Sequence, residues 1–207
     1  MGYTENRVTT KEFGTLPPDS PLLTNVPTAP GHPQQRLHVL VAGKFTEMSA
    51  AIESDLKFPL LAASGWRLHR WASREQYEQV LIAKYGSVAK GRLYLAFDSP
   101  HETGLACDFG CGGLMPISKT ISIQQQTPLF AWLKNHAWEH GFTPYMVEPW
   151  HWEVRLSLTE FQSGQPDPPP ASSPAPPVCD PDDPNCVDAP LDDISYSPIN
   201  PKILEPG

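Results

Sequence analysis

SPHETGLACD, residues 99–108, and EPWHWE, residues 148–153, are the two stretches that say most about this 207-residue chain. Together they carry two histidines and one aspartate that could close on a single divalent ion. Three protein ligands with a vacant fourth position are typical of catalytic rather than structural zinc sites. We therefore predict His101, Asp108 and His151 as metal ligands and zinc as the metal, although other first-row metals compete for such donors.

Glu148 precedes His151 by one short turn of chain and could face the same cavity. A carboxylate beside a metal site can take a proton from water as the water attacks a carbonyl, and can then return it to the leaving amine. A metal site with a neighbouring carboxylate is the smallest set of groups that can hydrolyse an amide bond in this way. The alternative at these positions is a buried polar network without metal, which would leave the charges poorly compensated.

Four landmarks resemble one known family. The spacing S-x-H-x-x-G-x-A-x-D, followed downstream by E-P-W-H, resembles the zinc D-alanyl-D-alanine carboxypeptidases of the VanY and VanX type. These belong to the M15 peptidase family, which also includes L-alanyl-D-glutamate endopeptidases. Residues 64–67, SGWR, look like the family's S-G-Y-R turn, and residues 132–142 look like the helix before its catalytic glutamate. The match covers roughly Leu37 to Leu158, in the family's order.

The resemblance implies a role for each matching residue. It gives zinc binding to His101, Asp108 and His151, and it makes Glu148 the general acid and base. It also implies that Arg67 stabilises the developing oxyanion or anchors the substrate, which suits the fixed fork of a guanidinium.

Two further residues are expected at the substrate. The resemblance implies that Ser99 helps to bind it, and Trp150 could form a wall of the cleft, although packing in the core is the commoner use of a tryptophan. Residues 68–72 depart from the family's short polar turn, which leaves Arg70 as a rival to Arg67. The segment between Phe142 and Glu148 is shorter than the family's covering hairpin. A more open cleft would favour a polymeric or cross-linked peptide.

Proline and charge divide the chain into three parts. Of the 25 prolines, six lie in residues 1–33, an expected extended arm, and thirteen in residues 165–207, an expected acidic tail. The tail has eight acidic residues against one lysine, so residues 1–164 are almost neutral. Such a chain lacks the basic stripe that nucleic-acid binding requires. Residues 34–164 are the expected zinc peptidase domain, and no apolar run is long enough to span a membrane.

Periodicity and capping residues predict an α+β fold, with a small antiparallel sheet and helices packed on it. The core opens with an apolar run at residues 37–41. Helices are expected at residues 45–58, 73–85 and 127–140. Strands are expected at residues 60–67, 91–97, 104–109 and 150–158.

Several histidines, cysteines and glutamates have competing interpretations. His136, Glu139 and His140 fit the H-x-x-E-H pattern of inverzincins, although His140 would also be favoured simply by the end of a helix. Cys107, next to Asp108 on a strand, should point to the opposite face and pair with Cys111 or stay a buried thiol. Cys179 and Cys186 could close a disulfide loop, bind calcium weakly or remain thiols. Glu102 and Glu153 are expected in supporting or solvated roles, with Glu153 a weak alternative base.

Together with the resemblance, the sequence thus predicts a zinc peptidase that cleaves peptidoglycan stem peptides, as a D-Ala-D-Ala carboxypeptidase or an L-Ala-D-Glu type endopeptidase. A second hypothesis is a catalytically silent binding module whose proline-rich arms attach it to a protein partner. Residues 1–10 lack the features of an ordinary secretory signal peptide. The location therefore stays open between a cytoplasmic pool and delivery to the cell wall by phage, an injection particle or lysis.

Overall fold

The computed structural model describes residues 3–92, 95–110, 114 and 116–168. The chain forms two units, Met1–Asp167 and Pro168–Gly207, and all the helices and strands below belong to the first. Cys111, Cys179, Cys186 and nearly all of the acidic tail lie outside the described residues, so the interpretations of these cysteines stay predictions.

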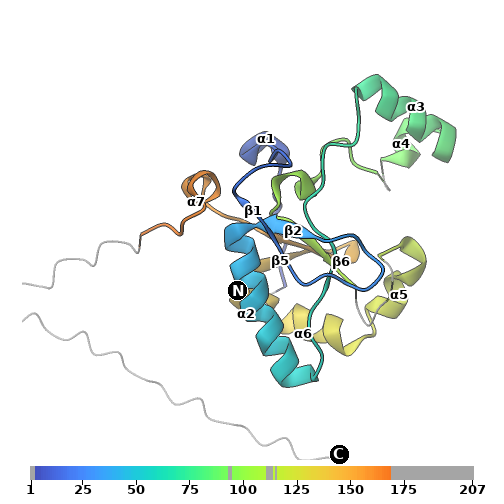
Figure 1. The fold of residues 1–207 in the computed structure, drawn as a ribbon. Coiled ribbons are helices and arrows are strands. Elements are labelled where there is room, and N and C mark those ends of the chain that lie inside the picture. The colour runs from blue at the N-terminus through green and yellow to red at the C-terminus, as the bar shows by residue number, and fades with distance from the viewer. Residues whose placement is uncertain (1–2, 93–94, 111–113, 115, 169–207) are drawn as a thin grey trace, which may run out of the picture. The chain divides into compact units, whose positions relative to one another are not determined.

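The first unit mixes helices with two small antiparallel sheets, as the α+β prediction requires (Figure 1). The strands are β1 (Leu23–Asn25), β2 (Arg36–His38), β3 (Ala62–Ser64), β4 (Ala106–Phe109), β5 (Phe142–Tyr145) and β6 (Glu148–Val154). The α-helices are α1 (Thr10–Phe13), α2 (Val39–Leu56), α3 (Arg74–Tyr85), α4 (Val88–Gly91), α5 (Ile121–Gln124), α6 (Pro128–His136) and α7 (Leu158–Ser163). Short 3-10 helices are η1 (Pro100–Thr103), η3 (Ser118–Thr120) and η4 (Ala137–His140). None of the described helices has the length and hydropathy to cross a bilayer.

The four-stranded sheet has the order β3-β4-β6-β5, and every neighbouring pair is antiparallel. Its two central strands, β4 and β6, pair Asp108 directly with His151 and Cys107 with Trp152. Residues opposite one another in an antiparallel pair project from the same face. The sheet register therefore brings two of the predicted metal ligands together from separate parts of the chain.

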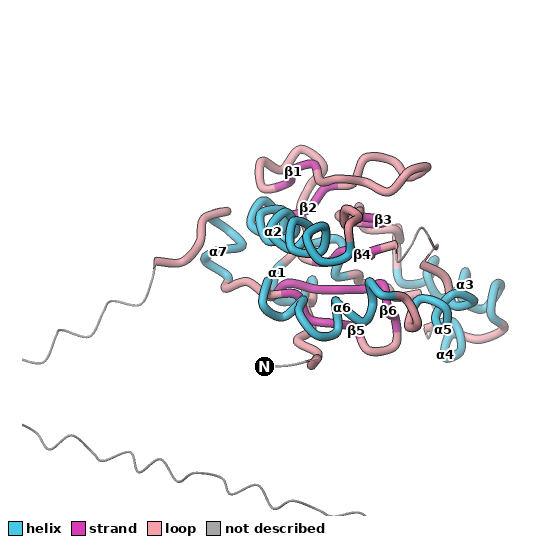
Figure 2. The backbone as a smooth tube through the Cα atoms, turned by 90° about the horizontal axis from the view of Figure 1, so that it is seen from below, coloured by secondary structure: helices cyan, strands magenta, loops and turns pink. Residues whose placement is uncertain are grey.

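Helix α2 supplies much of the core. Its residues Val41, Phe45, Met48 and Ile52 recur at helical spacing and are fully buried. The helix contacts β1, β2 and α6, and Figure 2 shows it running beside both sheets. The Phe45 ring lies 5.9 Å from the ring of Phe109 on β4, so the helix and the metal-bearing strand share one core.

The N-terminal segment, expected as an extended arm, contains α1 and β1 and packs on the rest of the first unit. Val8, Phe13, Leu16 and Val26 are buried in the same core as α2. Strand β1 pairs with β2 along three residues of each strand. Apolar residues are interspersed with the prolines of this segment. A proline-rich composition is therefore compatible with a segment that packs on the domain.

Capping residues locate two helices as predicted. Ser73 caps α3 by accepting a hydrogen bond from the Gln76 N–H at 3.1 Å, and Gly86 ends the helix in the left-handed region. Thr127 likewise caps α6, whose 3-10 extension ends at Gly141 with φ +80°. Helix α2, in contrast, begins six residues before the expected start, because the His38 side chain caps it.

The strand expected at residues 91–97 is wrong for the described part of that range. Gly91 ends α4 in close contact with Leu81, which leaves no room for a Cβ. The carbonyl groups of Leu95 and Ala96 accept hydrogen bonds from the side chains of Tyr77 and Trp71. The backbone acceptors that a strand would use are therefore taken by a small second core around α3.

The closing strand is shorter than expected at its C-terminal end. Strand β6 begins at Glu148 and ends at Val154, and Ser157 then caps α7. The Ser157 hydroxyl accepts from the Glu160 N–H at 3.0 Å. This cap starts a helix, so the alternation of side chains that is typical of a strand does not continue to Leu158.

Candidate metal centre and cleft

His101, Asp108 and His151 form a buried cluster whose potential ligand atoms all lie within 4.8 Å of one another. Asp108 Oδ1 is 2.9 Å from His151 Nδ1 and 3.3 Å from His101 Nε2. The two facing ring nitrogens are 3.2 Å apart. The structure thus brings together the three residues predicted as metal ligands, His101 from η1 and the other two from β4 and β6.

The outer nitrogen of each ring is held by an acceptor. His101 Nδ1–H donates to the Gly65 carbonyl at 2.8 Å, and His151 Nε2–H donates to Glu153 Oε1 at 2.9 Å. A carbonyl and a carboxylate can only accept, so these contacts fix which nitrogen of each ring faces outward. The remaining nitrogens converge on Asp108, which is the arrangement seen when a supporting group orients a metal-binding histidine.

Burial and the neighbouring charges act in opposite directions on the ionisation of the cluster. Burial alone would raise the pKa of Asp108, but the two histidines more than offset it and hold that pKa well below its usual range. Burial lowers the pKa of His151, but hydrogen bonds to Asp108 and Glu153 outweigh it and raise the pKa to about 9. His151 thus lies between two carboxylates, Asp108 and Glu153, and a bound metal ion would supply the positive charge that such surroundings favour.

A cavity of about 290 Å³ opens onto this cluster. Every residue predicted for the site lines it. They are Arg67, Ser99, His101, Asp108, Glu148, Trp150 and His151, with the rival Arg70. The cleft is therefore a single place in which all the predicted groups can meet one ligand.

Glu148 reaches this cavity because β6 is irregular at its start. Tyr145 pairs with Glu148 while the preceding residue Pro144 pairs with Trp152, so three residues of β6 bulge out between the two pairs. Strict alternation would send Glu148 and His151 to opposite faces of the sheet. The bulge removes that conflict, and both residues line the cavity.

Arg67 and Ser99 are joined to one another on the cleft wall. Arg67 Nη2 donates to Ser99 Oγ at 2.9 Å, and the Arg67 backbone N–H donates to the His101 carbonyl at 3.3 Å. The Arg70 guanidinium instead lies over the Trp71 ring, 5.0 Å from its centroid. Both arginines line the cavity, but Arg67 is the one attached to the metal-bearing segment.

The competing interpretations receive little support. His136 Nδ1 lies 3.2 Å from Glu139 Oε1 on the exposed end of α6, and the rings of His136 and His140 lie against Trp132. Within the part of the chain that the structure describes, the His101 cluster is the one group of three such ligands close enough to share an ion. The inverzincin alternative is therefore not favoured.

Cys107 and Glu102 are buried beside the cluster without joining it. Cys107 is fully buried, and burial raises the pKa of its thiol well above the usual value. Glu102 Oε1 accepts from the Ser99 N–H at 3.1 Å, and its other oxygen lies 3.0 Å from His69 Nδ1. Glu102 thus braces the turn that carries His101, in the supporting role expected for it.

Some contacts at the site carry no sequence signal, even that of Gly65, which lies in the motif at residues 64–67. The Gly65 carbonyl orients His101, the Tyr145 ring lies 5.9 Å from the His151 ring, and Arg7 Nη2 lies 2.9 Å from Glu153 Oε1. A backbone carbonyl has no side chain to recognise, and Arg7 reaches the site from the far end of the sequence. Only the tertiary structure could identify them.

Comparisons with known proteins give distant likenesses. No protein-family model and no curated protein matches the chain. A mutant of the vancomycin resistance D,D-pentapeptidase VanY from a VanB-type cassette, in complex with Zn(II), superposes with a TM-score of 0.43 and 17% identity, covering 72% of this chain and 86% of that one. VanYB in complex with D-alanine-D-alanine gives a TM-score of 0.45 and 18% identity, covering 73% and 89%.

The LdcB LD-carboxypeptidase gives a TM-score of 0.36 and 22% identity, covering 69% of this chain and 74% of that one. These identities and TM-scores are too low to assign an activity.

Proposed function

We propose that this protein is a zinc peptidase that hydrolyses an amide bond in peptidoglycan stem peptides. The observation that carries the proposal is the convergence of His101, Asp108 and His151 at a cavity that Glu148 and Arg67 also line. Two imidazoles and one carboxylate are a donor set that suits a catalytic zinc ion, which His101, Asp108 and His151 would hold. Bound zinc would supply Lewis-acid chemistry, polarising the scissile carbonyl and lowering the pKa of an attacking water.

The chain's own residues divide the remaining work. Glu148, on the cavity wall, takes the proton from the attacking water and passes it to the leaving amine. Arg67 offers a fork of donors to the oxyanion or to a terminal carboxylate of the substrate. Its bond to Ser99 holds that fork in place.

The substrate class is proposed from two features. The motifs in residues 99–108 and 148–151 resemble those of the M15 carboxypeptidases and endopeptidases that act on peptidoglycan. The cleft is also lined by the arginines Arg67, Arg70 and Arg92. Such a wall suits a peptide that carries free carboxylates, as stem peptides do.

The test is incubation of the zinc-loaded protein with defined muropeptides, followed by mass spectrometry of the products. Release of a single alanine would identify a carboxypeptidase, and cleavage within the stem an endopeptidase. Unchanged muropeptides in the presence of stoichiometric zinc would contradict the proposal and favour the silent binding module.

Glu148→Gln keeps the size of the side chain and removes its ability to accept a proton. We expect kcat to fall by roughly 100-fold or more, because general acid–base catalysis contributes about that much. Zinc content should stay the same, since Glu148 is not one of the clustered ligands. Glu47→Gln, an exposed acid on α2, is the matched control and should leave kcat unchanged. Full turnover by Glu148→Gln would assign the proton transfer to another group.

A further inference from the structure

The N-terminal segment Glu5–Val8 lies along strands β5 and β6, and its residue Arg7 lines the same cavity as the metal cluster. Met146 N–H donates to Glu5 Oε1 at 2.6 Å, and Thr143 Oγ1 donates to the Asn6 carbonyl at 3.4 Å. The Arg7 carbonyl accepts from Arg155 Nη1 at 2.8 Å. The segment is thus attached to the sheet at three successive residues, which we call the strap (Glu5–Val8).

The strap holds a buried carboxylate, Glu153, which is only 1% exposed. Arg7 Nη2 lies 2.9 Å from Glu153 Oε1, and the Val8 N–H donates to Oε2 at 2.5 Å. The same Oε1 accepts from His151 Nε2 at 2.9 Å. Both oxygens of Glu153 are therefore occupied, one by the strap backbone and one shared between Arg7 and the metal-ligand ring.

Arg7 is itself held in one orientation. Its guanidinium carbon lies 3.7 Å from the centroid of the Tyr145 ring, and its side chain is 35% exposed. Tyr145 in turn contacts the His151 ring edge-on at 5.9 Å. Because Arg7 touches Glu153 on one side and Tyr145 on the other, it braces two of the groups that contact His151.

We propose that Arg7 is a positioning residue for the metal ligand His151, acting through Glu153. The inference rests on the metal site put forward under the proposed function. A carboxylate taken out of water needs a fixed counter-charge, and the strap supplies one that does not come from the metal ligands themselves. With Arg7 in place, Glu153 keeps His151 Nε2 as its partner and leaves Nδ1 aimed at Asp108 and His101.

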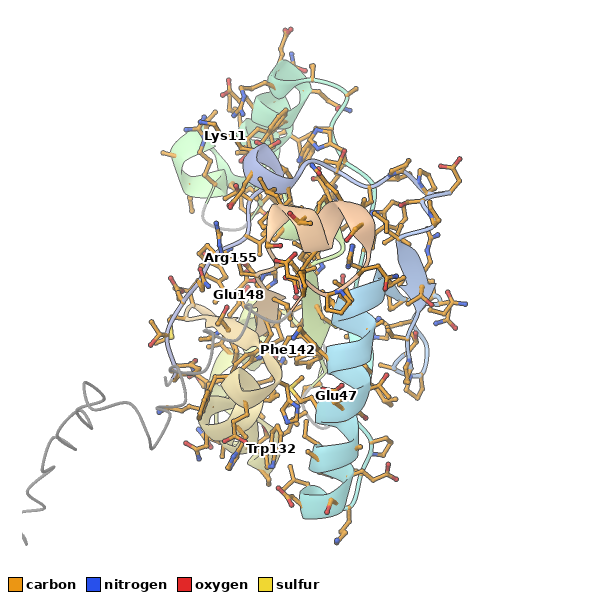
Figure 3. All side chains as sticks on the ribbon, turned by 90° about the vertical axis from the view of Figure 1, so that its left-hand side faces the viewer. Lys11, Glu47, Trp132, Phe142, Glu148 and Arg155 are labelled. Atoms are coloured by element: carbon orange, nitrogen blue, oxygen red, sulfur yellow. The ribbon has the colours of Figure 1, made fainter. Side chains whose placement is uncertain are left out.

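The first test is the zinc affinity of Arg7→Gln, measured by competition with a chromophoric chelator. We expect binding to weaken by roughly 10-fold, since removal of a group that orients a metal-binding histidine costs about 10–100-fold in affinity. Arg7→Lys keeps the charge and should bind zinc more tightly than Arg7→Gln. Lys11→Gln, which removes the same charge from an exposed residue of α1, should bind zinc like the parent protein. In Figure 3, Lys11 lies on α1, away from Glu148.

A double-mutant cycle with Glu153→Gln separates positioning from general destabilisation. If Arg7 acts through Glu153, adding Arg7→Gln to Glu153→Gln should change zinc affinity by less than 2-fold, well short of its effect alone. Melting temperatures in excess chelator report any effect on folding alone. If the role of Arg7 were merely structural, Arg7→Gln would lower the melting temperature measured in excess chelator and leave the zinc affinity unchanged. That result would overturn the inference.

The two proposals fail in different ways. A parent protein that binds no stoichiometric zinc would remove the metal site and the proposed function together. A parent protein that binds zinc, with Arg7→Gln binding it equally well, would overturn only the role of Arg7. Activity gives a second readout, because kcat of Arg7→Gln should recover toward the parent value when zinc is raised to saturation.

Discussion

His38 is a buried histidine whose two ring nitrogens have different partners. Its Nε2–H donates to the Phe161 carbonyl at 3.0 Å, while Nδ1 accepts from the Leu40 N–H at 3.3 Å. Its ring also stacks on Phe161, with centroids 5.4 Å apart. This arrangement requires a neutral imidazole, because a proton on Nδ1 would face the N–H that begins α2.

The stability of the protein should therefore depend on pH at His38. Burial lowers its pKa, and the Phe161 carbonyl and Glu160 offset this only in part. As pH falls below about 6.5, the unfolded chain takes up a proton that folded His38 refuses, so the free energy of unfolding decreases. His38→Phe should cost about 1–3 kcal/mol at neutral pH, from two unsatisfied backbone groups, and should flatten the slope.

Urea unfolding of the parent and His38→Phe at a series of pH values from neutral to 4.5 measures this difference. The comparison between the two proteins cancels the titration of the other histidines. Equal slopes in both proteins would mean that His38 does not carry the dependence.

At the scale of elements, the turn between η1 and β4 sets the distance between His101 and Asp108. Gly104 ends η1 with φ +74°, and a Cβ there would meet His38 N at 3.0 Å and Leu23 Cδ2 at 3.1 Å. The Gly104 carbonyl also accepts from the His38 N–H at 3.0 Å. The turn is therefore restricted both by its own backbone and by the neighbouring β2.

Gly104→Ala should destabilise the protein by about 1–3 kcal/mol from backbone strain alone and further through the close contacts. It should also weaken zinc binding, because relief of the contacts moves the turn that carries His101. Gly86→Ala is the matched control, since Gly86 has φ +83° with nothing within 4 Å of its Cβ position. Denaturant unfolding and zinc titration compare the two variants, and equal losses in both would mean that the contacts contribute nothing.

Elements with local signals could be predicted from the sequence, and those determined by distant partners could not. Ser73 and Gly86 locate the two ends of α3, because both residues form hydrogen bonds with the backbone of the helix itself. The start of α2 depends on a histidine cap that is not a usual N-terminal residue. The range 91–97 has strand-like composition, but the carbonyls of Leu95 and Ala96 accept hydrogen bonds from Tyr77 on α3 and from Trp71 ahead of it.

The candidate site divides in the same way. Its three clustered ligands have recognisable side chains and spacing, so the sequence predicts them as a set. The bulge that turns Glu148 into the cavity, the Gly65 carbonyl and the strap depend on contacts between segments far apart in the chain. Such contacts leave no periodic trace in a single sequence.

At the scale of the whole molecule, a cation held by η1, β4 and β6 should stabilise the folded state. Binding to the folded chain alone adds about 2.7 kcal/mol when free zinc is 100 times its dissociation constant. For a chain of this size, that free energy corresponds to a rise of roughly 5–10 °C in melting temperature. Scanning calorimetry in excess zinc and in excess chelator measures the rise.

Asp108→Asn should abolish most of this zinc-dependent rise, because Asp108 Oδ1 lies within 3.3 Å of a ring nitrogen of each histidine. Lys11→Gln again serves as the unaffected comparison. A rise of the same size in Asp108→Asn would indicate that zinc stabilises the protein from some other position.

The direct pairing of Asp108 with His151 in the β4–β6 register has a consequence for assembly of the holoprotein. A slip of one residue between these strands would turn one partner to the far side of the sheet and separate the two donors. Tight binding of the ion thus requires that two stretches of chain whose ligands are 43 residues apart have first paired in the correct register. Tight metal binding is therefore expected late in folding, and it indicates that β4 and β6 at the centre of the sheet have paired in the correct register.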